Sequence, residues 1–386
     1  MIKDIKLLAF FNFFTDLKFH SAILILYFAK VTDSYLLAMS LFSVAMVSAA
    51  LFEVPTGIFS DLIGRKRTIM MGAIAALTSA IFYAIGFNYW ILFIGAVFEG
   101  LSRAWYSGNN DAFLYDTLLE RNKQQDYGEY LGKVSSMFQA ALSIGALVGG
   151  VIATFSFGLV MWLSVIPQGI CVLISTLMSE PKKHSQKSAN IFSHLHLSAL
   201  HLWKNKKLRL LSLSSILGFG ISEASFDFRS AFVATLWPIW AIGFSKVLPY
   251  VGGTIGYWFS GRIVKKFGAY FIVLASSIYS RTINIFSTLF PTVLSPILMS
   301  STSLLYGISG VASNKLRQDE YTHEQRATID SINSLLGKLF FGVAALGIGF
   351  LGDNFGPAIA LLVGQIILIP TVFINWFLYN KHKHAN

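Results

Sequence analysis

The sequence predicts an all-α membrane protein whose spans fall into two halves of six. Three observations support this prediction. The chain is strongly apolar, with 54% hydrophobic and only 13% charged residues. About twelve windows reach the roughly 20 apolar residues that a bilayer crossing requires. One long polar segment divides these windows into two groups of equal number. An average soluble domain carries about 25% charged residues and needs far less apolar surface.

The polar segment 180–207 marks the expected domain boundary. It separates an N-terminal six-span bundle over 1–179 from a C-terminal six-span bundle over 208–386. The first apolar segment is too long for a signal peptide and lacks a small-residue cleavage site, so we expect it to remain as the first span. The spans are expected near 5–29, 35–60, 68–87, 90–113, 128–155, 157–178, 208–234, 237–262, 270–290, 292–315, 325–351 and 357–379.

The net charge of +11 is explained by membrane orientation. In a soluble protein it would suggest a nucleic-acid partner. Here most of the 30 lysines and arginines fall in loops on one side of the predicted spans, and only Lys30 falls on the other. The positive-inside rule therefore predicts a multi-pass protein of the cell (inner) membrane with both termini cytoplasmic, and no nucleic-acid partner. The single cysteine, Cys171, excludes an intrachain disulfide or multi-cysteine metal site.

The linker carries apolar residues at helical spacing, which predicts an interfacial helix lying on the membrane. These residues are Phe192, Leu195, Ala199 and Leu202. The same stretch holds His194, His196 and His201. A metal cluster is one interpretation of them, but no carboxylate or cysteine accompanies them, so histidines at headgroup level or in water are favoured.

The loop between the second and third predicted spans carries an ordered motif. Gly57, Asp61 and Gly64 lie at spacings of four and three, so on a helix they share one face. Glycines on that face allow another helix to approach, and the carboxylate can reach a cation or the N–H groups at a helix start. Three cations follow and place the loop in the cytoplasm: Arg65, Lys66 and Arg67.

The pattern G-x-x-x-D-x-x-G-R-K-R resembles the signature loop of the major facilitator superfamily (MFS) of secondary transporters. A generic basic loop would explain the cations but not the register of glycine and aspartate. The resemblance implies the MFS fold, two six-helix bundles related by a pseudo-two-fold axis around a central cavity that opens alternately to each side. It also implies a cytoplasmic gate in which Asp61 caps the eleventh span near Thr322 to Glu324 and Arg65 reaches Asp116.

Two internal matches support related halves. Gly261, Lys265 and Gly268, after the eighth span, repeat the spacing of the glycine motif with lysine in place of aspartate. We therefore expect Gly261 and Gly268 to serve helix packing. In the first span Asp16-Leu17-Lys18 is echoed by Asp227-Phe228-Arg229 in the seventh, so acid, apolar residue and base recur in order.

Charged side chains near the bilayer centre cost about 2.5 to 3.5 kcal/mol each, so each one needs a reason. In the first span Asn12, Asp16 and His20 recur every four residues. This spacing predicts a polar stripe that faces the central cavity, for substrate binding or proton coupling. Lys18 lies about 200° round the helix from Asp16 and is expected to point elsewhere.

Two further spans of the first half carry charge. Glu99 and Arg103, four residues apart in the fourth span, are expected to pair along the helix, either as coupling residues or as a neutral structural pair. Ala96 and Glu99 replace the arginine and glutamine usual in the family. Glu53 in the second span is a candidate proton carrier, or it pairs with a cation such as Lys133 and never titrates.

In the second half, charged and polar residues also fall within predicted spans, and their opposite signs nearly balance. They are Glu223, Asp227, Arg229, Lys246, Arg281, Asp330, Asn333 and Lys338. Asp227, Arg229 and Lys338 are the candidates there for substrate binding or proton coupling. Because the signs balance, the charge of the substrate does not follow from the sequence.

The fifth span reads A-L-S-I-G-A-L-V-G-G, which resembles the G-x-x-x-G-P-x-x-G-G motif of the family's drug and metabolite antiporters. Gly145, Gly149 and Gly150 match the motif, whereas Ala141 and Ala146 replace its first glycine and its proline. The resemblance implies close helix packing at the three glycines and favours export.

No enzyme signature accompanies these features, so we expect no catalytic residue, cofactor or metal site. His323-Glu324 lacks the second histidine of a zinc motif. The favoured interpretation is a proton-coupled exporter of a small amphiphilic or organic solute. The alternatives are a proton-coupled importer of a nutrient or metal chelator and a non-transporting membrane sensor. The expected partners are the lipid bilayer, a small-molecule substrate and protons, with the chain acting as a monomer.

Overall fold

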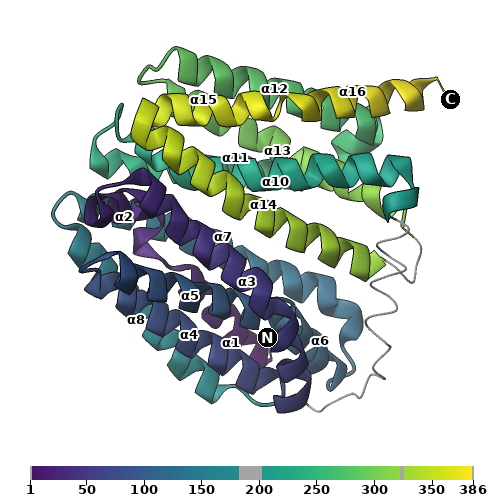
Figure 1. The fold of residues 1–386 in the computed structure, drawn as a ribbon. Helices are drawn as coiled ribbons and strands as arrows, with labels where there is room; N and C mark the ends of the chain where they lie inside the picture. Colours follow the sequence, from purple (N-terminus) through teal and green to yellow (C-terminus); the bar gives the residue numbers. More distant parts are fainter. Residues whose placement is uncertain (1, 182–201, 322–325, 385–386) are drawn as a thin grey trace. The chain divides into compact units, whose positions relative to one another are not determined.

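The computed structural model describes residues 2–181, 202–321 and 326–384, except for the side chains at positions 61, 326 and 327. All regular structure in these residues is helical (Figure 1). Contacts divide the chain into two compact units: Met1–Gln186 with Pro238–Val247, and Lys187–Trp237 with Leu248–Asn386. The expected interfacial helix and its histidines lie outside the described residues, apart from Leu202.

The first unit contains the six spans predicted for the N-terminal half, two of them broken. The first predicted span consists of two helices with a short 3-10 turn between them, and the fourth is interrupted at Gly108, whose φ is +68°. The helices are α1 (Lys3–Asp16), η1 (Phe19–Ala22), α2 (Leu24–Thr32), α3 (Tyr35–Ile63), α4 (Arg65–Ile85), α5 (Tyr89–Tyr106), α6 (Asn109–Leu119), η2 (Gln124–Asp126), α7 (Tyr127–Ala153) and α8 (Phe157–Leu177).

Side-chain caps fix where three of these helices begin. Ser34, Asn88 and Ser156 precede α3, α5 and α8, and each side chain accepts a hydrogen bond from the backbone N–H three residues later, at 3.1 to 3.2 Å. Serine and asparagine are favoured at this position because they satisfy N–H groups that have no partner within the helix. These polar residues between apolar runs therefore set the span boundaries.

The second unit contains the helices that correspond to the seventh to twelfth predicted spans. They are α10 (Lys206–Val233), α11 (Ile239–Phe267), α12 (Ala269–Leu289), α13 (Ser295–Gln318), α14 (Arg326–Phe355), α15 (Pro357–Ile367) and α16 (Ile369–Lys383). The twelfth span is split at Leu368 because Pro370, in the first turn of α16, has no N–H to continue the helix of α15. The start of α11 packs with the first unit.

Each predicted window coincides with helix, but the windows differ in how apolar they are. Six helical segments of the described chain are long and apolar enough to cross a membrane: 35–60, 65–85, 124–153, 157–177, 328–355 and 357–383. The pair α11 and α12, bent by 119°, passes the same test together and brings the total to as many as seven. The remaining windows are broken or carry more polar residues, as in α1, α5, α10 and α13.

Large apolar side chains lie on the outside of the helices, as a lipid-facing surface requires. Trp90 and Trp258 are 69% and 82% exposed. Many serine, threonine, asparagine and glutamine side chains are instead buried, among them Gln168 and Asn284. Polar side chains between helices are a feature of membrane bundles, where hydrophobicity alone gives no preference for helix association.

Small residues bring corresponding helices together in both units. In the first, a Cβ at Gly100 of α5 would lie 2.5 Å from the Ser48 Cβ and 2.8 Å from the Ala49 nitrogen of α3. In the second, a Cβ at Gly307 of α13 would lie 2.6 Å from the Gly253 oxygen of α11. The second and fourth spans of each half therefore touch at the backbone, which only small residues permit.

We expect Gly100→Ala to destabilise the protein by about 1–3 kcal/mol, because the added methyl group overlaps the α3 backbone. Thermal unfolding in detergent measures this loss. Gly169→Ala in α8 is the control, since no atom lies within 4 Å of its Cβ position. Equal unfolding temperatures for the two variants would contradict the packing described for α3 and α5.

Candidate functional site

The first span leaves the α-helix where its charged residues lie. Helix α1 ends at Asp16, Lys18 is extended with φ −101° and ψ 100°, and η1 begins at Phe19. The prediction of a continuous helical stripe of Asn12, Asp16 and His20 is therefore wrong. The break removes the helical register, so that His20 lies in the 3-10 turn and no longer one turn beyond Asp16.

Side chains of α8 satisfy the backbone at this break. The Gln168 Nε2 donates to the carbonyl oxygens of Phe14 and Thr15 at 3.4 and 3.2 Å, and the His20 N–H donates to the Ser164 Oγ at 3.2 Å. Both α8 side chains are almost completely buried. Irregular backbone at membrane depth is tolerated only where the protein supplies such partners, so the break is a built feature of the fold.

Glycines of α7 make room for the same break. A Cβ at Gly145 would lie 2.9 Å from the Lys18 oxygen, and one at Gly149 would overlap the carbonyl of Phe19. Gly150 faces the backbone of Gly243, within the segment of α11 that belongs to the first unit. The three glycines expected to serve helix packing thus lie directly against other backbone segments.

Glu99 of α5 gathers two cations beside the break. Its carboxylate accepts a hydrogen bond from the Arg103 Nη2 at 2.7 Å, lies 3.8 Å from the Lys18 Nζ, and accepts the Tyr83 hydroxyl at 2.8 Å. The helical pair expected from spacing is present. Lys18 was expected to point elsewhere than Asp16, and the break directs its side chain toward Glu99.

Asp16 and His20 retain unused polar atoms next to this ion-pair cluster. In residues 2–181 and the other described ranges, the half-buried Asp16 carboxylate makes no ion pair or hydrogen bond. The buried His20 ring packs edge-to-face on Tyr83, and its Nδ1 has no partner among the described atoms. The Asn12 Oδ1 is occupied, since it accepts from the Asn110 Nδ2 at 3.3 Å.

Glu53 of α3 lies at the interruption of the fourth span. Its Oε1 accepts a hydrogen bond from the Ser107 hydroxyl at 2.9 Å. Lys133, one partner considered for it, is paired with Glu129 one turn away on α7 at 2.5 Å. Glu53 therefore ties α3 to the end of α5.

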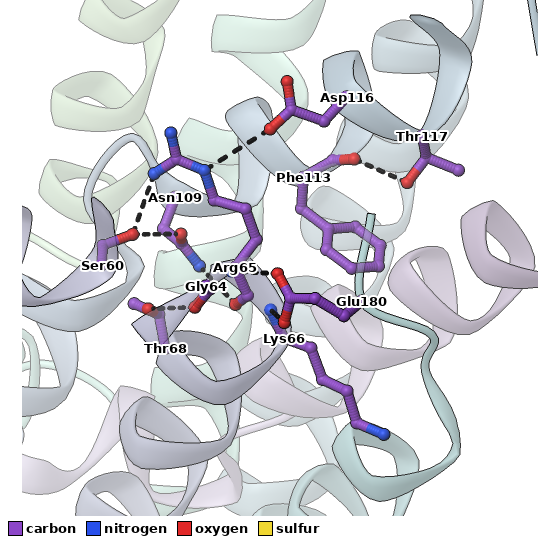
Figure 2. A network of polar contacts seen from close by, with 10 residues as sticks. All are labelled: Ser60, Gly64, Arg65, Lys66, Thr68, Asn109, Phe113, Asp116, Thr117 and Glu180. Atoms are coloured by element: carbon purple, nitrogen blue, oxygen red, sulfur yellow. Dashed lines mark hydrogen bonds and ion pairs between the residues drawn. The ribbon is translucent and has the colours of Figure 1, made fainter. Parts of the chain in front are cut away.

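The motif loop is held by residues from several helices (Figure 2). The Arg65 Nη1 donates to the Ser60 Oγ at 2.9 Å, and its Nε lies 3.5 Å from an Asp116 oxygen in α6. Asn109 accepts the Ser60 hydroxyl at 2.8 Å and donates to the Arg65 carbonyl at 3.2 Å. The structure thus brings Arg65 and Asp116 together. The side chain of Asp61 and its expected partners at 322–324 lie outside the described residues.

A carboxylate that the sequence did not single out completes this network. Glu180, just after α8, accepts hydrogen bonds from the backbone N–H groups of Arg65 and Lys66 at 2.6 and 3.0 Å (Figure 2). A negative charge is favoured at a helix N-terminus, where such N–H groups lack partners. The Lys66 Nζ also donates to the Thr176 carbonyl, whereas Arg67 is exposed. No local pattern connects Glu180 with a loop so distant in the chain.

Gly64 meets two constraints in this loop. Its φ is +97°, and a Cβ at this position would lie 2.5 Å from the Glu180 Oε1. Gly57, Gly261 and Gly268 have no described atom within 4 Å of their Cβ positions. The packing role expected of Gly261 and Gly268 is therefore not found in the structure. Gly268 is explained by its φ of +82°, which only glycine adopts without strain at the break between α11 and α12.

The candidate residues of the second unit lie on unbroken helices. Asp227 and Arg229 are in the last two turns of α10, and Lys338 is in α14. The Arg229 guanidinium lies 5.8 Å from the centre of the Phe226 ring, and its Nε is buried without a partner among the described atoms. The repeated order of acid, apolar residue and base therefore lies at a helix break in the first span and within a continuous helix in the seventh.

Polar contacts also hold together the end of the second unit where α10 begins and α13 ends. The Glu320 carboxylate receives Lys207 at 2.7 Å and Asn205 at 3.1 Å. Burial alone raises the pKa of Glu320, but the hydrogen bonds from Lys207 and Asn205 outweigh it and leave this pKa below its usual value. Asp330 accepts the Tyr321 hydroxyl at 2.8 Å and the Gln318 Nε2 at 2.9 Å, so it connects α14 with the end of α13.

The sequence profile of the Major Facilitator Superfamily matches residues 7–344. The chain belongs to this superfamily. An uncharacterized MFS-type transporter of Methanocaldococcus jannaschii is 23% identical over 331 residues, 79% of each chain. An uncharacterized transporter of Buchnera aphidicola is 27% identical over 161 residues, which span 42% of this chain and 40% of that protein.

Solved MFS-like structures share the fold at low identity. A mutant of the nucleoside transporter NupG superposes with a TM-score of 0.83 at 13% identity, covering 97% of this chain and 99% of that one. A bacterial homolog of the human lysosomal transporter Spinster gives 0.73 at 13% identity, covering 97% and 94%. The predicted family and fold class are confirmed. The chain is a multi-pass membrane transporter of the MFS type, which implies a bilayer and a small-molecule substrate.

Gly64→Ala should cost about 1–3 kcal/mol of stability for two reasons. Alanine is strained at the positive φ of this position, and its methyl group overlaps the Glu180 carboxylate. In the Glu180→Ala background the loss should shrink to the φ contribution alone. Thermal unfolding of the two single variants and the double variant measures this coupling. Gly268→Ala is the matched control, with a similar φ and no atom within 4 Å. A Gly64→Ala loss that is independent of residue 180 would contradict the contact.

Proposed function

We propose that this MFS protein is a proton-coupled secondary transporter and that the broken first span forms part of its substrate and proton site. The observation that supports this proposal is the Asp16 carboxylate. It lies at the end of α1, beside nonhelical backbone, and makes no described ion pair. In secondary transporters, discontinuous helices near the membrane midplane are where substrates and coupling ions bind.

Charge compensation favours Asp16 over Glu99 as the residue that takes up the proton. Protonating Glu99 would leave Lys18 and Arg103 without a counter-charge inside the membrane, which is costly. Protonating Asp16 instead removes a charge that has no ion-pair partner in the described structure. We assign Glu99 to hold the cations, with the Nδ1 of His20 available to a substrate.

Export of a small amphiphilic or organic solute is the direction that we propose. It is supported by the glycine pattern of α7, which resembles that of the family's antiporters and packs against the break at Lys18 and Phe19. The lysine and arginine distribution supports cytoplasmic termini and an inner-membrane location. We further propose that the chain acts as a monomer.

A ligand screen should precede the transport assay. Thermal unfolding of the purified protein against metabolites and amphiphilic drugs identifies a transport probe, because a ligand that binds the folded state raises stability by mass action. Flux of that probe in proteoliposomes with an imposed pH gradient then tests coupling and direction. Movement of the probe in the same direction as the protons, rather than in the opposite direction, would favour the importer.

Asp16→Asn should reduce accumulation driven by the pH gradient at least about tenfold, because the amide cannot carry a proton across the membrane. Exchange of internal for external probe should continue, since it needs no net proton movement. Asp33→Asn, at an exposed loop after α2, is the control and should transport normally. Full gradient-driven accumulation by Asp16→Asn would show that another group carries the proton.

We propose that Gly57, Asp61, Gly64, Arg65, Lys66, Arg67 and Asp116 form a cytoplasmic gate. The contact between Arg65 and Asp116 supports this proposal. Asp61→Asn should then slow turnover several-fold, because the inner side closes less firmly without the carboxylate.

Cysteine labelling tests the gate directly. In a Cys171→Ser background, Asn12→Cys should react faster with an impermeant maleimide from the cytoplasmic side when Asp61→Asn is added. Asp126→Asn, at the start of α7, is the control and should change neither rate. Unchanged turnover together with unchanged labelling in Asp61→Asn would contradict the gate.

A further inference from the structure

The second unit contains an arginine within a span that no described carboxylate neutralises. Arg281 lies in α12, and its Nη1 donates to the Gln365 Oε1 of α15 at 2.7 Å. Its Nε is buried and has no hydrogen-bond partner among the described atoms. In residues 202–321 and 326–384, no ion pair to Arg281 is present. A neutral amide orients the guanidinium but leaves its charge uncompensated.

Arg281 belongs to a polar seam between α12 and the helices of the twelfth span. Ser277, Arg281 and Asn284 share one face of α12 by helical spacing. The Ser277 Oγ accepts from the Asn375 Nδ2 of α16 at 2.9 Å, and the Ser214 Oγ of α10 donates to the Asn375 Oδ1 at 3.3 Å. Polar side chains therefore connect the three helices α10, α12 and α16. Arg281 lies about one turn along α12 from Ser277, on the same face.

Ser225 brings an unused hydroxyl to the same seam. It follows Ser214 by three helical turns on the same face of α10. Its Oγ lies 3.3 Å from the Cβ position of Gly364, the residue before Gln365. Ser225 is 7% and Asn284 is 4% exposed, and the Ser225 Oγ and Asn284 Oδ1 both lack partners among the described atoms. One unsatisfied polar atom therefore lies beside the residue that precedes Gln365, and another lies about one turn along α12 from Arg281.

The acidic residues of α10 do not lie on the helix face that carries Ser225. Glu223 and Asp227 each lie about 160° round the helix from Ser225. Arg229, about one turn beyond Ser225, adds a second cation without a described ion pair. In the first unit, by contrast, Glu99 supplies the counter-charge for cations within the spans.

We propose that a small inorganic anion of halide size binds on this seam beside the Arg281 guanidinium, as the missing counter-charge. The free Nε–H of Arg281 and the hydroxyl of Ser225, which can rotate to donate, are its ligands. A cation inside a span normally has an opposite charge as partner, and burying one without compensation is unfavourable. The site lies wholly in the second unit and is independent of the direction of transport.

The test compares thermal unfolding of the full-length protein in detergent, in sodium chloride and in sodium gluconate of equal ionic strength. The wild-type unfolding temperature should be about 2 to 4 °C higher in chloride, with a saturable dependence on concentration. Arg281→Gln should lose this shift because the anion has lost its cation. Arg262→Gln, which removes an exposed arginine of α11, should retain it.

Gln365→Glu provides a second variant that does not depend on loss of the arginine. It places a carboxylate where the amide oxygen now lies 2.7 Å from Arg281. The unfolding temperature in gluconate should rise and the chloride shift should disappear, since the protein then carries its own counter-charge. Absence of a chloride shift in the wild type would overturn the proposal. So would a full shift in Arg281→Gln or in Gln365→Glu.

Discussion

The first unit depends on one constraint: backbone that leaves the helix inside a membrane must find its hydrogen bonds within the protein. Gln168 and Ser164 of α8 supply these bonds at the break after Asp16. The glycines of α7 allow the nonhelical segment to lie against their backbone. The break therefore requires two neighbouring helices with particular small and polar residues. It fixes where Lys18 and His20 lie, and with them the charged cluster.

Charge within the spans is organised differently in the two units. In the first, Glu99 pairs with Lys18 and Arg103 beside the break, and Asp16 makes no described ion pair. In the second, Arg281 is oriented by an amide and has no described acid partner. A balance of signs counted over the whole sequence hides this difference, because compensation depends on which side chains touch.

Much of the architecture follows from local sequence. In the described residues each apolar window located a helix, although η2 and most of α6 fall outside the windows. The four-residue spacing of Glu99 and Arg103 correctly predicted a pair. The break in the first span was not predictable in this way, since no proline or glycine occurs between Asn12 and His20. Its causes lie in α7 and α8, more than a hundred residues away. Glu180 was missed for the same reason, because only the folded chain brings it to the start of α4.

Asp16 connects the broken helix with the ion coupling that we propose. The carbonyl end of a helix carries partial negative charge, so an unpaired carboxylate there is disfavoured by the backbone as well as by the membrane. A proton or a cationic group of a substrate would relieve this repulsion, whereas a carboxylate already bound to two cations, such as Glu99, would gain nothing from either. In the coupling that we propose, a proton and a cationic group of a substrate would compete for the Asp16 charge at this break. Such competition for a single carboxylate is sufficient to couple their movements in opposite directions.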